Sequence, residues 1–505
     1  MIQNIQKNIL LVFILSYNFM TYGQDNNWTF DRLKQEYQVN RFYKDIFKNP
    51  ALMLGNGKYN VSEFKAIYSS IDEEANRIQK PNKQNGLRLL ASSFYPTDST
   101  TTLWGKAGYV NSNQKNIVWN ESIDYDVIYP YFTADSVGGN LKNESYNFLG
   151  GYAKSFTKVD FGAQMSYNAT LASRSRDPRV RNISSNLELK LGMNLKGFLG
   201  SSLGIYGGYQ KYTQSNNISF FSRISTPAVY HLNGLGYFNN LLRGTNLRSF
   251  YEGSGYGVGL VSAPTKSRDM WLTVDFDQLT IAKFLVETLS TQVSNLKNQN
   301  LNVNLTKLFY TDKNVYGVKL NYIHNTRKGI ESVISARSGA GLSVIAQNEN
   351  YNLRNTVFGI SGVFYRDNKT NLFSISPYAK YQKYREDYLL IRSFQYFDYL
   401  DKGVELRYVK SIDNSSAFIC GVNFNYRTVL SEEALLRNDS EESLSNMLLL
   451  NNRLLASNFF ETKIELEVNK KIKENLNFFI GLDANLITIN ENVNNSIVLT
   501  TGVRF

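Results

Sequence analysis

Cysteine, histidine and proline are scarce in this chain of 505 residues, which contains one Cys, two His and eight Pro. The single cysteine, Cys420, excludes an intramolecular disulfide. Its place in the C-terminal half also argues against a lipoprotein, whose lipid is attached to a cysteine at the export cleavage site. Two histidines and one cysteine are too few for a transition-metal cluster. We therefore predict no metal ion and no other cofactor.

Long apolar runs are also lacking after the N-terminus, and charged residues make up only 19% of the chain, while aromatic residues reach 14%. Such a chain is too aromatic to be disordered. Its mean hydropathy of −0.33 is too low for a bundle of membrane helices. These exclusions favour an all-β protein with one polar and one apolar face.

The N-terminus has the three-part pattern of a secretory signal peptide. Lys7 precedes the apolar run 9–15, and Thr21-Tyr22-Gly23 follows it. The run is shorter than the roughly 20 residues of a membrane-spanning helix. We predict cleavage after Gly23, which divides the chain into a signal peptide (1–23), an N-terminal periplasmic or hatch segment (24–58) and a β-barrel (59–505).

Apolar and polar residues alternate along nearly the whole chain, which is typical of strands with one face toward water. The clearest runs are 416–427 and 460–469. Their polar faces predict that seven residues line a lumen: Asn423, Asn425, Arg427, Glu461, Lys463, Glu465 and Glu467. The mixed charge of this set predicts weak ion selectivity.

The length of these runs favours a membrane. Most are about ten to fifteen residues long, whereas soluble strands average about five or six and a tilted spanning strand needs about nine to eleven. A sheet in hydrocarbon must close on itself to pair its backbone amides. We predict a closed antiparallel transmembrane β-barrel of roughly 18 strands, within a range of about 14–18, in the cell outer membrane and with a short plug-like N-terminal segment.

The predicted connections between strands alternate between short periplasmic turns and long outer segments, provided that 269–290 forms one strand. The predicted long segments are 121–143, 214–253, 328–353, 387–398 and 430–456. The chain ends inside its last alternating run, with Phe505 on the apolar face and Gly502 on the other. A terminal aromatic residue resembles the signal that directs outer-membrane barrels to the barrel assembly machinery. Gly502 and Phe505 are therefore candidate insertion-signal residues, and outer-membrane lipid and lipopolysaccharide are expected partners.

Residues 103–182 resemble an uncharacterised family of outer-membrane β-barrel proteins of Bacteroidota. The resemblance supports the fold and the compartment and transfers no activity. It is carried by Leu103-Trp104-Gly105, Trp119-Asn120-Glu121, Tyr129-Pro130-Tyr131, 134–139, 144–152, Asp177-Pro178-Arg179 and Asn182.

A shorter motif, Asn49-Pro50-Ala51, is similar to an element in the N-terminal segment of long-chain fatty acid transporter-type barrels. A simple turn is the alternative interpretation. If the resemblance holds, it implies that 24–58 folds into the barrel mouth as a hatch, with Asn49 and Pro50 as hatch residues. The stretch before the first strand is too short for the plug domain of a TonB-dependent transporter.

Only His231 and His324 offer near-neutral acid–base chemistry. His231 falls in a predicted outer segment, and His324 should face lipid near the outer rim. An outer-membrane phospholipase keeps its catalytic histidine there, but its pattern continues to a serine where this chain has Thr326. We predict no catalytic residues and no enzyme activity, with a phospholipase-type enzyme as an unfavoured alternative.

An arginine cluster lies on a predicted outer loop around Asp177-Pro178. Guanidinium groups bind phosphate in a bidentate manner, so lipopolysaccharide or another anion is the predicted contact of Arg174, Arg176, Arg179 and Arg181. The alternative is that Asp177 and its neighbours hold the shape of the loop. Export makes nucleic acid an improbable partner for the net charge of +12.

These observations predict a barrel for passage or uptake of small solutes, or an accessory subunit of a surface uptake complex with a surface lipoprotein or transporter as its partner. The alternative is a channel for hydrophobic substrates like that of fatty acid transporters. The sequence does not identify the substrate.

Overall fold

The protein is described by a computed structural model that covers residues 30, 32, 33, 37, 42–56 and 60–505. Gaps lie at 199–200, 223–225, 245–246, 265–268, 288–289, 337–341, 369, 414, 438–440 and 474–475. The predicted signal peptide and most of 24–41 lie outside the described residues.

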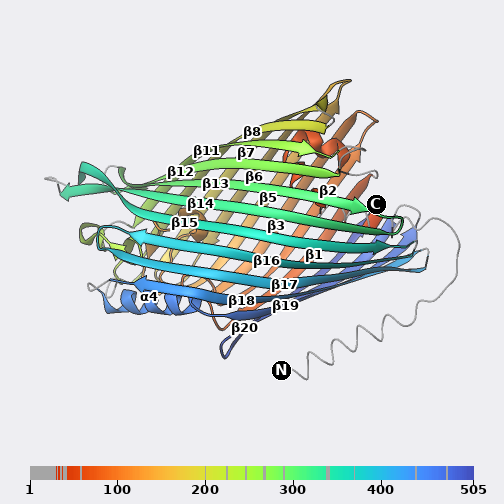
Figure 1. Ribbon diagram of the computed structural model, residues 1–505. Helices are drawn as coiled ribbons and strands as arrows, with labels where there is room; N and C mark the ends of the chain where they lie inside the picture. The colour runs from red at the N-terminus through yellow and green to blue at the C-terminus, as the bar shows by residue number, and fades with distance from the viewer. Residues whose placement is uncertain are drawn as a thin grey trace.

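Eighteen antiparallel strands form one closed barrel (Figure 1). Each strand pairs with the next one along the wall, and β21 pairs with β1 to close the ring. This confirms the predicted fold and falls at the upper end of the predicted strand range. The wall consists, in order, of β1 (Val61–Glu73), β2 (Lys83–Pro96), β3 (Thr101–Ile117), β5 (Gly139–Ser155), β6 (Val159–Ser173), β7 (Arg179–Phe198), β8 (Ser201–Ser219), β11 (Arg248–Ala263), β12 (Met270–Leu285), β13 (Thr291–Tyr310), β14 (Asn314–Ala336), β15 (Leu342–Asp367), β16 (Asn371–Tyr388), β17 (Ser393–Asp413), β18 (Ser416–Leu435), β19 (Phe459–Lys473), β20 (Leu476–Ile489) and β21 (Asn492–Arg504).

The period-2 pattern of the sequence determines which side chains face outward. Exposed apolar side chains share one parity on each strand, and they form the outer surface of the barrel. Examples are Phe64, Tyr146, Phe148, Leu191, Phe358, Ile360, Ile480 and Leu499. The opposite parity carries the polar residues of the interior.

The longest connections, 118–138, 220–247 and 436–458, lie at the same end of the barrel, as the sequence predicts, whereas other connections at that end are as short as 174–178 and 490–491. Segment 269–290 is indeed one strand, β12, followed by a turn. Two predicted outer loops are wrong in extent: 328–353 is mostly the paired ends of β14 and β15, and 387–398 shrinks to a turn at 389–392. Between β14 and β15 the ladder continues past the expected rim, with register shifts at Gly329/Ile330 and Val333/Ile334.

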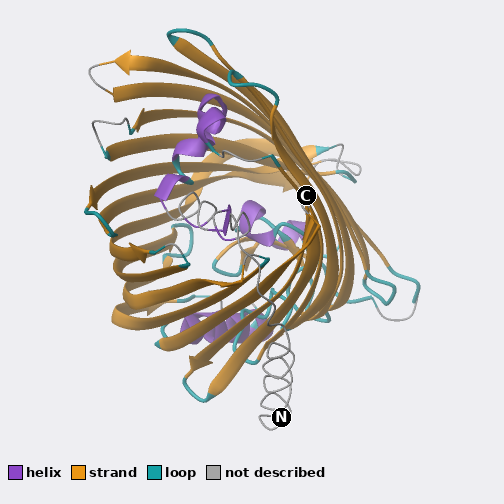
Figure 2. Cartoon of the chain, turned by 90° about the vertical axis from the view of Figure 1, so that its right-hand side faces the viewer, coloured by secondary structure: helices purple, strands orange, loops and turns teal. Residues whose placement is uncertain are grey.

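Short elements fill both ends of the barrel. Near the C-terminus, the 3-10 turns η3 (Ile46–Lys48) and η4 (Pro50–Gly55) lie inside the ring of strands (Figure 2). At the opposite end lie three short helices, namely α3 (Tyr125–Ile128), η5 (Asn240–Leu242) and α4 (Glu442–Leu455). A small sheet of three strands lies with them and consists of β4 (Thr133–Ala134), β9 (Tyr230–Gly234) and β10 (Tyr237–Phe238). None of the described helices is long and apolar enough to span a membrane.

Candidate functional site

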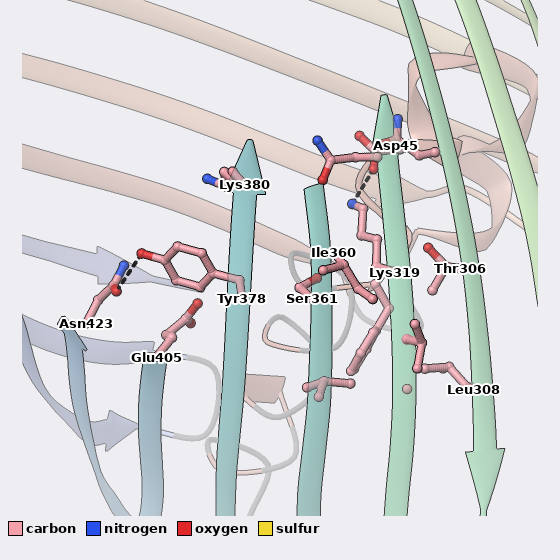
Figure 3. A pocket seen from close by; sticks show the side chains of 16 residues that line it. Asp45, Thr306, Leu308, Lys319, Ile360, Ser361, Tyr378, Lys380, Glu405 and Asn423 are labelled. Carbon is pink, nitrogen blue, oxygen red and sulfur yellow. Dashed lines mark hydrogen bonds and ion pairs between the residues drawn. The ribbon is translucent and has the colours of Figure 1, made fainter. Parts of the chain in front are cut away.

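A polar cavity of about 370 Å³ opens in the lumen against the inner faces of β13 to β18 (Figure 3). A second cavity of about 390 Å³ shares Glu405 and Asn423 with it and continues along β17 to β21. Polar side chains dominate both linings. Those of the first cavity are Asp45, Asn304, Thr306, Lys319, Asn321, Ser361, Tyr378, Lys380, Glu405 and Asn423.

Most charges around these cavities are paired with opposite charges. Arg407 holds Glu465 through two hydrogen bonds of 2.7 and 2.9 Å, and Arg427 holds Asp401 in the same way. Such bidentate pairs fix both side chains in orientation. The cavity walls are therefore a rigid arrangement of charges with little net sign.

The residues predicted to line the lumen all lie on inward-facing positions of β18 and β19. Asn423 accepts a hydrogen bond of 3.2 Å from the Tyr378 hydroxyl, and Lys463 pairs with Glu461 at 3.0 Å. The remaining members lie in the same lumen: Glu465 pairs with Arg407, Arg427 with Asp401, Asn425 contacts Glu461 at 3.4 Å, and Glu467 pairs with Arg504 at 2.9 Å.

The N-terminal segment, here the described residues among 30–56, is anchored to the wall by Asn49 and Pro50. The Asn49 amide donates to the carbonyls of Met193 and Ile205 at 3.1 and 3.4 Å, while its oxygen caps η4 by accepting from the Ala51 N–H at 3.0 Å. Glycines make room for this contact, because a Cβ at Gly162 or Gly192 would overlap Pro50 or Asn49. The motif thus sits in a pocket of the strands β6 to β8.

The other side of this segment is held by aromatic rings and two ion pairs. Tyr43 stacks on Trp271 with ring centroids 5.0 Å apart, and Asp45 and Lys48 pair with Lys319 and Asp275, each at 2.6 Å. Buried apolar side chains complete the contact, namely Phe30, Leu33, Tyr37, Phe42 and Ile46 against Val261, Leu308, Tyr365, Leu372 and Val409. The segment therefore lies across the end of the lumen next to the first cavity.

The outer cap, defined as 118–138, 226–244 and α4, occupies the other end. Glu121 is fully buried and pairs with Arg174 at 2.7 Å, while the amides of Asn182 and Asn216 both donate to its carbonyl. Burial and a hydrogen bond to the carboxyl of Asp135 raise the pKa of Glu121 well above its usual range.

A second set of contacts fixes the middle of the same loop to the wall. The Tyr129 and Tyr351 hydroxyls donate to Glu386 at 2.5 and 2.9 Å, and Lys283 donates to the carbonyl of Phe132 at 3.2 Å. Three of the stretches that carry the predicted family resemblance, 119–121, 129–131 and 134–139, lie in this cap or at its boundary.

The four arginines of the predicted anion contact have different surroundings in the structure. Arg174 does not belong to it, because its side chain is 3% exposed and pairs with Glu121. Arg179 pairs with Asp177 at 3.0 Å, and Asp177 accepts from the backbone N–H groups of Phe221 and Ser222. The alternative that Asp177 shapes the loop therefore has structural support. Arg176 and Arg181 are exposed at the outer end.

The other predicted residues lie as follows. His324 is on the outward face of β14 and contacts the Thr356 hydroxyl at 2.8 Å, and His231 is buried in β9. Phe505 is exposed on the outer surface, where its backbone pairs with Ser62. A Cβ at Gly502 would press on the Phe479 ring.

Sequence reasoning missed the inward residues of β13 to β16, among them Lys319, Tyr378 and Lys380. A signal was present, since the outward parity of Tyr316, Val318 and Leu320 assigns Lys319 to the interior. Asp45 could not be found, because nothing in the sequence indicates that it reaches Lys319.

Solved structures similar to this chain are outer-membrane proteins at low identity. The copper transporter OprC matches with a TM-score of 0.42 and 9% identity over 88% of this chain and 80% of that one. BauA, the ferric preacinetobactin receptor from Acinetobacter baumannii, matches with a TM-score of 0.41 and 9% identity over 89% and 80%. A FadL homologue from Pseudomonas aeruginosa matches with a TM-score of 0.33 and 8% identity over 91% and 93%.

No curated protein matches the sequence. A match to a family of unknown function, DUF6850, spans residues 50–505. It includes the stretches of predicted resemblance at 103–182 and continues to the C-terminus. Because the match covers nearly the whole barrel, the chain belongs to the DUF6850 family of proteins of unknown function.

Proposed function

We propose that the protein is an outer-membrane β-barrel that takes up a small polar solute through a lumen gated at both ends. The observation that carries this proposal is the seating of the N-terminal segment beside a polar cavity. Asp45 and Lys48 link the segment to the wall by ion pairs at 2.6 Å. The side chains of Asp45, Lys48 and Lys319 are 22–38% exposed, and that of Asp275 is 9% exposed. Such partly exposed contacts are reversible.

Placement in the outer membrane is supported by the outer surface of the barrel. Exposed aliphatic and aromatic side chains cover it, and among the described strands of the wall β21 pairs with β1, so that this ring has no unpaired edge. The predicted signal peptide and the terminal Phe505 agree with export and with insertion by the barrel assembly machinery. Lipid and lipopolysaccharide would surround the wall, with Arg176 and Arg181 at the height of anionic headgroups.

A permanently open diffusion channel is less well supported than a gated one. The outer cap is joined to the wall by a buried ion pair of Glu121 and a partly buried hydrogen bond of Tyr129, and the N-terminal segment lies across the other end. Since both closures are built from loops or terminal segments, either can move without breaking the barrel. An accessory role beside a surface lipoprotein stays a prediction.

A hydrophobic substrate is also less well supported, although Asn49-Pro50-Ala51 resembles a sequence element of fatty acid transporter-type barrels. Asparagine, lysine, threonine and glutamate side chains line the lumen cavities, and an acyl chain would leave these groups desolvated without partners. Polar solutes satisfy them instead.

Liposome swelling tests the proposal. A double variant lacks 24–58 and carries a Gly-Ser linker in place of 122–132, and it should admit arabinose much faster than the intact mature protein. Oleate binding by the intact protein, measured in the same detergent, should be negligible. Slow swelling by a folded double variant, or saturable oleate binding, would overturn the proposal.

A further inference from the structure

Two lysines of the first cavity face the same polar floor. Lys319 projects from β14 and Lys380 from β16, with β15 between them. The β15 residues beside them are Ser361 and Gly359, which are small. Because neighbouring strands lie about 4.8 Å apart, the two backbones are separated by roughly 10 Å. Figure 3 shows the Lys319 ammonium beside Asp45 and the Lys380 side chain on the β17 side of β16, so a ligand that reaches both lysines must extend across β15 and β16.

Lys380 makes no ion pair within the described part of the chain. Its cross-strand neighbour Asp401 is engaged by the Arg427 guanidinium through bonds of 2.7 and 2.9 Å. The Lys380 ammonium lies over the Tyr378 ring, 5.0 Å from its centroid. A cation is thus presented to the cavity while its cross-strand carboxylate, Asp401, is engaged by Arg427.

Lys319 does have a carboxylate partner, but that partner does not belong to the wall. Asp45 comes from the N-terminal segment and reaches Lys319 at 2.6 Å, as Figure 3 shows. When the segment withdraws, Asp45 leaves with it and both lysines face the cavity without it. An anion arriving from solution would then meet two cations.

We propose that the cavity binds a small carboxylate that also carries hydroxyl groups, and that its carboxylate takes the place of Asp45 on Lys319 while the ligand extends toward Lys380. The proposal rests on the proposed uptake function and adds the substrate class. A ligand carboxylate competes directly with Asp45, so binding loosens the N-terminal segment. The hydroxyls would meet hydrogen-bonding side chains of the same lining, namely Asn304, Thr306, Asn321, Tyr378, Glu405 and Asn423. The cavity volume of about 370 Å³ is within the usual range for small-molecule sites.

Calorimetric titration of the full mature protein in detergent tests this proposal with glucuronate as the probe and glucose as its neutral counterpart. We expect saturable glucuronate binding and at least tenfold weaker glucose binding. Lys380→Met should weaken glucuronate binding about tenfold, because it removes a charge-assisted contact. Asp45→Asn should strengthen it, because the competing carboxylate is gone. Lys190→Met is the matched control: Lys190 is an inward lysine of β7 paired with Glu188 and outside the cavity lining, so affinity should not change.

Trp271 supplies a second readout, because it stacks on Tyr43 of the segment. Glucuronate should change its emission, and Trp271→Phe should abolish the change. Equal binding of glucose and glucuronate, or wild-type affinity in Lys380→Met, would overturn the carboxylate site, and unchanged Trp271 emission on binding would overturn the displacement of Asp45. If the double variant still admits arabinose in any of these cases, the uptake function stands and only this inference falls.

Discussion

A substitution at Gly192 tests whether the Asn49 contact holds the N-terminal segment against the barrel wall. A Cβ at Gly192 would overlap Asn49 Oδ1 and approach Pro50 Cδ to 2.9 Å, so Gly192→Ala should expel Asn49 from its site. The Asn49 amide would then lose its hydrogen bonds to Met193 and Ile205. At about 0.5–1.5 kcal/mol each, the loss is about 1–3 kcal/mol, which lowers the docked-to-undocked ratio roughly 5- to 150-fold.

Hydrogen exchange followed by mass spectrometry measures this ratio directly. The backbone N–H groups of Asn49, Leu52 and Asn56 are hydrogen-bonded within η3 and η4, so peptides covering 46–56 should exchange faster in Gly192→Ala by the same factor. Gly150→Ala is the matched control, because a Cβ at Gly150 meets nothing within 4 Å. Equal exchange of 46–56 in the two variants would refute the reasoning.

Three further predictions concern the cap, the lumen and the outer rim. Because burial raises the pKa of Glu121, the cap should lose stability as the pH rises from about 4.5 through the higher folded-state pKa; proteolysis within 118–138 should speed up over that range in the wild type and much less in Glu121→Gln. Arg427→Met removes two hydrogen bonds from the buried Asp401 carboxylate and should lower the free energy of unfolding by about 1–3 kcal/mol, seen as a lower temperature of the heat-induced shift in electrophoretic mobility, while adding Asp401→Asn should restore part of the loss. Replacing Arg176 and Arg181 with serine should weaken lipopolysaccharide binding severalfold in a pull-down, whereas Arg174→Lys should not.

The sequence predicted the barrel well because its signal is local. Alternation along 416–427 and 460–469 places each side chain inside or outside, and the structure follows that parity on β18 and β19. The helix α4 was missed inside a predicted loop, although Leu444, Met447 and Leu448 follow helical spacing and are buried. Two outer loops were predicted too long, because strand pairing beyond the membrane leaves no separate mark in the sequence.

The candidate site was harder to predict because it depends on contacts between distant residues. Polar residues of β18 and β19 could be assigned to a lumen, but Asp45 and Lys319 are 274 positions apart and meet only in the fold. The same holds for Arg174, which local sequence assigned to an exposed cluster and the fold pairs with Glu121. Asn49-Pro50 was recognisable as a motif, whereas the glycines that receive it were not.

Single-channel conductance in planar bilayers tests the two-gate account most directly. Four proteins are compared: the intact mature chain, the variant lacking 24–58, the variant with a Gly-Ser linker in place of 122–132, and the double variant. The account predicts that the intact chain is silent, that each single variant conducts weakly and that the double variant forms a large, steady, weakly ion-selective pore. A large steady conductance in the intact chain, or silence in a correctly folded double variant, would contradict it.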